Sequence, residues 1–178
     1  MKRWFCSFIF MLTASTAVAQ LYRPVNSKNA VKFSIKNFGL TVTGSLADLS
    51  GNIQFNTDSL ASAYIRLTVA AATINTGNTT RDKHLVGAEY FNAAAYPVLT
   101  FASQTITKAA GGSFLAEGLI TIKAVTKKII IPFTATPIAG GYRFSGTCKI
   151  NRLHFKVGAS SWVLGDEVTI SFNINTVK

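Results

Sequence analysis

The sequence predicts an all-β fold, an antiparallel β-barrel of about eight strands that carries one short helix. Three observations predict this fold. Apolar and polar residues alternate with a period of two along most of the chain, paired glycines mark tight turns, and one segment, residues 79–101, interrupts the alternation. Such alternation is typical of strands with one buried face and one solvated face. The interrupting segment is therefore the most informative part of the chain.

The first 19 residues have the features of a secretory signal peptide. A positively charged start is followed by a short apolar run, Trp4 to Leu12, and by a small-residue cleavage site, Ala17-Val18-Ala19, before Gln20. The apolar run is too short to span a membrane. We therefore expect residues 1–19 to be cleaved and residues 20–178 to form one periplasmic or secreted domain.

The composition is basic, with a formal net charge of +11 at pH 7. The densest groups are Lys123-Lys127-Lys128 and Lys149-Arg152-Lys156. Solvated strand faces, which also protect sheet edges, are the simplest explanation of these charges. Attraction to an anionic membrane surface is the functional alternative. A nucleic-acid partner is not expected, because the leader indicates export and the chain lacks a motif that interleaves aromatic and basic residues.

Cys148 is the one cysteine outside the predicted leader, which contains Cys6. An internal disulfide is therefore excluded once the leader is removed. We expect Cys148 to be a small residue packed in a strand over Tyr142–Ile150. A disulfide with a second chain is the alternative.

The strands follow from the alternation and from the turn residues. Residues 31–36 and 168–175 each alternate apolar and polar positions. Between them, strands are predicted near Leu40–Leu46, Gly51–Asn56, Ala61–Thr73, Val98–Thr107, Ser113–Lys123, Lys127–Pro137 and Gly141–Ile150. Gly111-Gly112 and Gly140-Gly141 predict hairpin turns, because glycine adopts positive φ without steric cost. Strands this close in sequence should pair as antiparallel neighbours.

Eight or nine strands in one domain can hide their edges in a two-sheet sandwich or in a closed barrel. Phenylalanines lie on the apolar faces of separate strands, and small residues such as Ala71 and Gly118 lie among them. A barrel of about eight strands can fill its interior with side chains or keep room for one ligand. This composition favours the barrel.

Residues 79–97 predict the one helix. Thr79 and Asp82 have the spacing of a capping box, and Pro97 returns the chain to extended geometry. One apolar helical face would consist of Leu85, Val86, Ala88 and Phe91. A short helix in a β chain should close or support one end of the barrel.

Metal-binding signals are weak. Asp82 and His84 form the one local pair of metal-ligand type, and on a helix their side chains point to different sides. We therefore expect no metal site, with Asp82 capping the helix and His84 packing or forming a hydrogen bond.

Catalytic signals are weak as well. Ser160 and Ser161 lack a nucleophile elbow and a neighbouring base, and Cys148 has no local catalytic signature. Asp166 and Glu167 are adjacent in a strand, so we expect them to face opposite sides and to keep a turn soluble. The chain thus predicts a binding protein with no catalytic residues. The alternatives are an enzyme that depends on His84 or Cys148, and a basic module that docks on a membrane or a protein through Lys149, Arg152 and Lys156.

Four ordered motifs identify a family. Residues 81–101 contain an Arg-Asp-x-His-Leu start, the aromatic pair Tyr90-Phe91, then Tyr96-Pro97 and Phe101. Three more segments follow it, namely Gly118–Ile122 with Val125-Thr126-Lys127, Ile150-Asn151-Arg152 with Phe155 and Gly158, and Leu164–Val168. From about Tyr22 to Val177, this order resembles the YceI-like family, lipid- or polyisoprenoid-binding proteins exported by bacteria. The chain departs from the family pattern at Asn92, Ala124, Lys128 and His154.

The resemblance implies an extended lipocalin-like barrel whose hydrophobic tunnel holds a long isoprenoid or a related apolar lipid. That lipid would be the ligand, and no cofactor is expected. The residues expected to contact it inside the barrel are Phe33, Phe55, Phe101, Phe133 and Phe172, and those expected near the mouth are Phe38, Leu85, Tyr90, Phe91, Phe155 and Trp162. The alternative is that some of the same residues belong to an ordinary hydrophobic core. Transient contact with a membrane surface and pairing with a second copy of the chain are left open.

Overall fold

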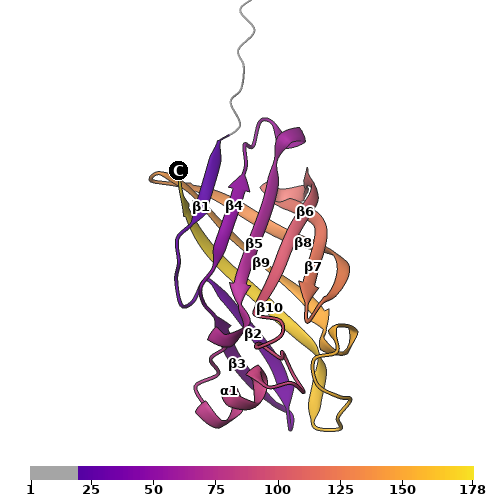
Figure 1. Ribbon diagram of the computed structural model, residues 1–178. Coiled ribbons are helices and arrows are strands. Elements are labelled where there is room, and N and C mark those ends of the chain that lie inside the picture. The colour runs from indigo at the N-terminus through magenta and orange to yellow at the C-terminus, as the bar shows by residue number, and fades with distance from the viewer. Residues whose placement is uncertain (1–19) are drawn as a thin grey trace, which may run out of the picture.

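The structure is a computed structural model that describes residues 20–178. The predicted signal peptide, residues 1–19, lies outside the described residues. Figure 1 shows the elongated barrel that the strands form. The strands are β1 (Leu21–Pro24), β2 (Val31–Asn37), β3 (Leu40–Leu46), β4 (Ser50–Gln54), β5 (Tyr64–Ala70), β6 (Val98–Lys108), β7 (Phe114–Ile122), β8 (Val125–Ile138), β9 (Gly141–Asn151) and β10 (Leu164–Val177). The helix is α1 (Thr79–Val86), and short 3₁₀ turns are η1 (Leu60–Ser62), η2 (Ala71–Thr73), η3 (Ala110–Gly112) and η4 (Arg152–Phe155).

The strands form one antiparallel sheet that closes into an eight-stranded barrel. Closure occurs at β10, which pairs with β9 along one edge. Its other edge pairs first with β2 and then, at Thr176 and Val177, with β1. The β2–β3 hairpin extends beyond β1 and β4 at the end of the barrel that carries α1 (Figure 1). The predicted fold class, an all-β barrel of about eight strands with one helix, is confirmed.

The predicted strands are present, and the structure differs from the prediction in three places. The sequence reading missed β1, which has only four residues and ends at Pro24. β5 is shorter than the predicted strand over residues 61–73, because 3₁₀ turns form on both sides of it. β10 begins at Leu164, four residues before the alternation over 168–175 becomes visible. Within residues 20–178, no helix is long and apolar enough to cross a membrane.

The paired glycines mark turns as predicted, although only three of the four have positive φ. Gly111, Gly112 and Gly140 have φ of 66°, 75° and 80°, whereas Gly141 already belongs to β9. A third hairpin, between β7 and β8, turns at Lys123 and Ala124 with φ of 51° and 60°. That turn has the geometry glycine usually provides, without a glycine, and the sequence reading did not identify it.

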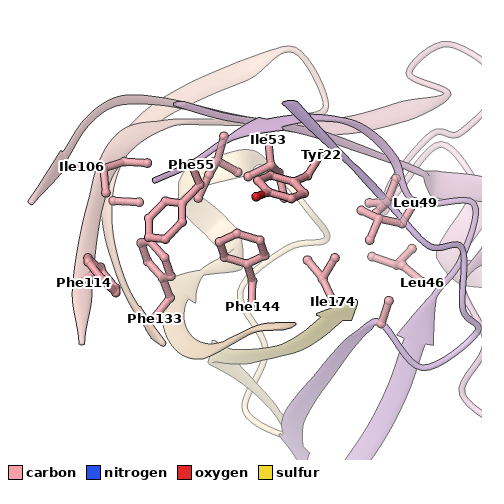
Figure 2. Close-up of a cluster of buried hydrophobic side chains, with 14 of the residues drawn as sticks. Tyr22, Leu46, Leu49, Ile53, Phe55, Ile106, Phe114, Phe133, Phe144 and Ile174 are labelled. Atoms are coloured by element: carbon pink, nitrogen blue, oxygen red, sulfur yellow. The ribbon is translucent and has the colours of Figure 1, made fainter. Parts of the chain in front are cut away.

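The end of the barrel opposite α1 is closed by aromatic side chains. Phe55 is 1% exposed and lies at the centre of this cluster (Figure 2). Its ring makes edge-to-face contacts with Phe114, Tyr142 and Phe144 at centroid distances of 5.1, 5.4 and 5.3 Å. Such pairs each contribute roughly 0.5–1.5 kcal/mol beyond the area that they bury. We call Tyr22, Phe55, Phe114, Phe133, Tyr142 and Phe144 the aromatic cluster.

The segment that interrupts the alternation contains α1, but two details of the prediction are wrong. Asn78, rather than Thr79, is the N-cap, and its side chain accepts a hydrogen bond from the backbone N–H of Arg81. Asp82 does not complete a capping box. Its carboxylate accepts from the backbone N–H and the hydroxyl of Thr76, at 2.9 and 2.6 Å.

The helix is also shorter than predicted, since it ends at Val86 before Gly87 and turns fill the chain up to Pro97. Ala88 is exposed. Leu85, Val86 and Phe91 still pack against the core, as the apolar face predicted. The helix therefore covers the barrel end beside β3, where Asn75 forms a two-residue bridge with Ser45.

Candidate ligand-binding cavity

The barrel interior contains two adjoining cavities. The inner chamber, toward the aromatic cluster, has a volume of about 140 Å³, and the outer chamber, toward α1, has a volume of about 680 Å³. Pockets for small molecules and cofactors typically measure roughly 300–1,000 Å³. The chambers share four lining residues, which we call the waist: Leu46, Leu99, Ile122 and Ile170.

The inner chamber is apolar. Side chains from β2 to β10 line it, and Thr68 and Thr100 are the two hydroxyl-bearing residues among them. Phe133 and Phe144 line the chamber and also belong to the aromatic cluster, so that cluster forms the floor of the cavity. A hydrocarbon chain could fill this chamber without leaving a buried polar group unpaired.

Two phenylalanine rings lie over glycines of the neighbouring strand. Phe33 pairs with Gly44 on β3, and a Cβ at Gly44 would lie 2.4 Å from the Phe33 ring. Phe172 pairs with Gly146 on β9, where a Cβ would lie 2.5 Å from the Phe172 ring. A side chain larger than that of glycine at either position would collide with the ring, so both glycines keep these rings in place along the cavity wall.

The outer chamber has an apolar wall and a polar mouth. Ile35, Val42 and Val168 line the wall, whereas the polar lining includes Arg81, His84, Glu89, Ser160 and Ser161. The guanidinium of Arg81 donates to the hydroxyl and to the carbonyl of Thr76, at 2.8 and 3.0 Å. The arrangement is suited to a molecule with a long apolar part and a polar end.

A buried arginine holds the loop on one side of the mouth. Arg152 is 4% exposed, and its guanidinium forms an ion pair with Asp166 at 3.0 Å. It also donates to four backbone carbonyls, those of Val157, Ala159, Leu164 and Gly165, at 2.8 to 3.3 Å. One side chain therefore fixes both ends of the 157–165 loop. Reading Arg152 as part of a solvated basic group was wrong, since it is buried and paired.

A lysine joins the loop to the segment after α1. The ammonium group of Lys123, in the β7–β8 turn, donates to the carbonyls of Ala88, Glu89 and Lys156 at 2.9, 3.3 and 3.0 Å. The backbone N–H of Gly158 donates to Glu89 at 3.0 Å. Three segments that are distant in sequence thus form one rim around the outer chamber.

The structure brings most of the predicted contact residues to the cavity. Phe101, Phe133 and Phe172 line the inner chamber, and Phe33, Leu85, Tyr90, Phe91 and Phe155 line the outer chamber. Three others lie elsewhere: Phe55 is the centre of the aromatic cluster, and Phe38 and Trp162 are exposed and line neither chamber. Ligand contact by any of these residues stays a prediction.

Catalytic and metal-binding groups are sparse around the cavity. Within residues 20–178, no three His, Cys, Asp or Glu side chains lie close enough to hold a metal ion together. Cys148 is buried and lines the inner chamber, and burial raises its pKa to about 11. An activated cysteine nucleophile requires a shift in the opposite direction. Asp166 and Glu167 have separate structural partners, Arg152 and Lys149.

The family model for the YceI-like domain matches residues 22–176. This chain belongs to the YceI-like family. This YceI-like chain is 31% identical over 157 residues to a UPF0312 protein of Photorhabdus laumondii, a match that covers 82% of this chain and 81% of that protein. It is 28% identical over 177 residues to a UPF0312 protein of Yersinia enterocolitica, with 94% and 92% covered.

Solved structures agree with the barrel of this YceI-like chain. The Campylobacter jejuni YCEI protein is 30% identical, with a TM-score of 0.69 over 77% of this chain and 85% of that chain. Burkholderia cenocepacia BcnA has a TM-score of 0.78 at 24% identity, with 88% and 96% covered. The likeness to BcnA shows the fold alone.

Sequence reasoning missed the two side chains that organise the mouth of this YceI-like barrel, Arg152 and Lys123. A signal for Arg152 was present, because Asn151-Arg152 and Gly158 belong to one family motif, and Gly158 has a φ of 68°. A Cβ at Gly158 would lie 2.8 Å from the Tyr90 ring and 3.1 Å from Nη1 of Arg152. Lys123 has no comparable signal, since its acceptors are backbone carbonyls.

We expect Cys148 to react slowly in the folded protein. A thiol with a pKa of about 11 is only about one part in a thousand thiolate at pH 8, and the thiolate is the reactive species. Labelling with a water-soluble disulfide reagent should be about a hundredfold slower in native protein than in urea, where the pKa returns toward 9.0. Comparable rates in both states would contradict the buried position.

The same pKa shift makes stability depend on alkaline pH. Between pH 9 and about 11 the unfolded chain loses the Cys148 proton, whereas the folded chain keeps it. The free energy of unfolding should therefore fall by about 1.4 kcal/mol for each pH unit in this window. The Cys148→Ala variant is the control, because it should lack this part of the pH dependence in urea titrations.

Proposed function

We propose that this protein binds a long isoprenoid or a related apolar lipid inside the barrel, as an exported carrier or buffer. The observation that supports this most strongly is the pair of adjoining chambers. They are apolar from the aromatic cluster to the waist and acquire polar groups only at the mouth. Membership of the YceI-like family agrees with the proposal. A Saccharophagus degradans polyisoprenoid binding domain has a TM-score of 0.64 at 18% identity, a likeness that shows only the shared fold.

The physical chemistry favours a carrier over a permanent store. Burying a five-carbon isoprene unit contributes about 4 kcal/mol relative to water, at ~0.8 kcal/mol for each carbon. A long isoprenoid resides in a membrane rather than in water, however, and transfer from lipid to an apolar chamber is nearly neutral. Reversible exchange with a bilayer is the expected behaviour. Selectivity would come from chamber shape and from polar groups at the mouth, such as Arg81 and His84.

The export part of the proposal rests on residues 1–19. Their charged start, short apolar run and Ala-Val-Ala site are typical of a secretory leader, and the barrel begins just after it at Leu21. A carrier in the periplasm or outside the cell would move apolar molecules through an aqueous compartment. Sequencing the N-terminus of protein from the cell envelope or medium should find Gln20 first. An intact start at Met1 would contradict this part.

Organic extraction tests the binding proposal. Protein purified without detergent from a bacterial host should yield a long apolar molecule at close to one per chain, detected by mass spectrometry. The same protein stripped by solvent and refolded should take up a polyprenol from vesicles. A barrel that yields no lipid and takes up no polyprenol would overturn the proposal.

Replacing Phe91 with Asp should weaken ligand retention while leaving the barrel folded. Phe91 lies outside the strands, lines the outer chamber and packs against buried side chains of the core. A carboxylate there places a charge in the apolar wall, which costs more than the roughly 1–3 kcal/mol for burying an unpaired neutral polar group. Bound polyprenol should fall in the F91D variant but not in Phe91→Leu, with circular dichroism reporting the fold. Unchanged retention of polyprenol in F91D would show that Phe91 contributes only to packing.

A further inference from the structure

Four large apolar side chains are exposed together at the mouth end of the barrel. Phe38 and Leu40, at the turn of the β2–β3 hairpin, are each 74% exposed. Trp162 is fully exposed and Val163 is partly so, in the loop before β10. The backbone N–H of Phe38 donates to the carbonyl of Val163 at 2.8 Å, which joins the two loops. We call these four residues the apolar tip.

The backbone at Phe38 is unfavourable for a phenylalanine. Phe38 has a φ of 49° and precedes Gly39, with a φ of 74°, so both central residues of the turn are left-handed. Asn, Asp and Gly are the residues that such a turn prefers, and a bulky side chain at positive φ is uncommon. Phe38 gains no compensating burial within residues 20–178. Neither its conformation nor its exposure is explained by the stability of the isolated barrel.

The surroundings of the apolar tip are basic. Exposed lysines lie on segments that meet at this end of the barrel (Figure 1). They are Lys36 on β2, Lys83 on α1, Lys127 near the start of β8 and Lys156 in the loop after η4.

Most carboxylates near this end are already engaged by other groups. Asp82 accepts from Thr76, and Asp166 is paired with Arg152. Glu89 is exposed at the rim. The end of the barrel that exposes the most prominent aromatic side chains therefore also carries an excess of positive charge.

We infer that the apolar tip and these lysines form a docking surface for an anionic lipid bilayer. Trp, Phe and Leu side chains lie favourably at the boundary between headgroups and acyl chains, and adjacent lysines attract anionic headgroups. Asn37, Ser161 and Val163 line the outer chamber, so the tip lies directly beside the mouth. In the docked position the mouth would face the membrane, and an apolar ligand would enter without crossing water.

A second copy of the chain is a weaker match to this surface. A two-fold dimer through the tip would bring the same lysines of both copies together, and like charges would repel. An anionic bilayer instead complements both the apolar side chains and the charge. The inference depends on the proposed function for its purpose, but binding to vesicles can be measured without any isoprenoid.

Vesicle binding by residues 20–178, which contain strands β1 to β10, tests this inference. Trp162 is the one tryptophan in this part of the chain, so its emission reports on the tip alone. Emission should shift to shorter wavelength with vesicles of phosphatidylcholine containing phosphatidylglycerol, and much less with phosphatidylcholine alone. Sedimentation with the same vesicles measures affinity.

Variants distinguish binding through the apolar tip from nonspecific adsorption to vesicles. Phe38→Asn removes the ring and suits the positive φ, so it should leave the hairpin intact. Combined with Leu40→Ser, it should weaken sedimentation with anionic vesicles by about tenfold or more. Ile130→Ser is the matched control, because Ile130 is 57% exposed on the barrel wall, and it should bind like the unaltered chain.

Three outcomes would overturn the docking surface: no binding to anionic vesicles, equal binding by the double variant, or a tip-dependent dimer in light scattering without vesicle binding. If the protein yields a lipid on extraction but does not bind vesicles, only this inference would be overturned and the proposed function would stand. If no lipid can be extracted but the protein still binds vesicles, the proposed function would be overturned and this inference would stand.

Discussion

Replacing Arg152 with Ala should lower the free energy of unfolding by about 3–5 kcal/mol, because several backbone carbonyls would lose their hydrogen-bond donor. The guanidinium is buried, and it serves Asp166 and four backbone carbonyls of the 157–165 loop. Asp166 is 40% exposed, so water can solvate its carboxylate when Arg152 is lost. Most of the effect should therefore come from the carbonyls that lose their donor, at roughly 1–3 kcal/mol for each one left buried.

Urea unfolding followed by circular dichroism measures this loss. Arg152→Lys should recover only part of the stability, because one ammonium group cannot reach acceptors on both sides of the loop as a planar guanidinium does. Lys149→Ala is the matched control, since Lys149 forms an exposed pair with Glu167 at 2.8 Å. That change should cost less than about 1 kcal/mol. A similarly small loss in Arg152→Ala would contradict the role of Arg152 in holding the 157–165 loop.

Replacing Ile170 with Trp should reduce polyprenol binding by about tenfold or more, equivalent to at least 1.4 kcal/mol of binding free energy. Ile170 belongs to the waist and lines both chambers. An indole there would fill the passage into the inner chamber, which has a volume of about 140 Å³. The fold should persist, because the half-buried side chain has adjoining space to occupy, although overpacking costs roughly 1–3 kcal/mol.

The matched control lies at the next position of the same strand. Ser171 lines a groove on the outer surface with Lys32 and Asn173, so Ser171→Trp adds the same side chain outside the barrel. Polyprenol uptake from vesicles should be normal in that variant and in Ile170→Leu. Full uptake by Ile170→Trp would show that the ligand does not pass the waist.

The sequence predicted the strands well because alternation is a local signal. In β7, inward-facing Phe114, Ala116, Ile120 and Ile122 are buried, as a period of two requires. β1 escaped notice because four residues ending in proline show too little pattern. The helix start was placed one residue late, since both Asn78 and Thr79 can cap. The role of Asp82 was not predictable from the helix alone, because its hydrogen-bond partner, Thr76, lies outside the helix.

The site was only partly predictable, because much of it depends on tertiary contacts. Alternation indicates that Phe55 and Phe172 point inward, but not that one fills the aromatic cluster while the other lies against Gly146 beside the cavity. Charge counting placed Arg152 in solvent, because its acceptors lie in a loop that only the fold brings to it. Phe38 and Trp162 occupy turns, where a period of two gives no direction.

The central claim is that an apolar chain occupies the barrel interior, and photo-crosslinking tests it most directly. A polyprenol carrying a diazirine near its apolar end would be loaded from vesicles, irradiated, and mapped by mass spectrometry of peptides. We predict labelling of inward-facing residues of β6, β7 and β10, including Phe101, Ile120 and Phe172, and its loss in Ile170→Trp. Labels confined to outward-facing residues, or equal labelling of the Ile170→Trp variant, would contradict the claim.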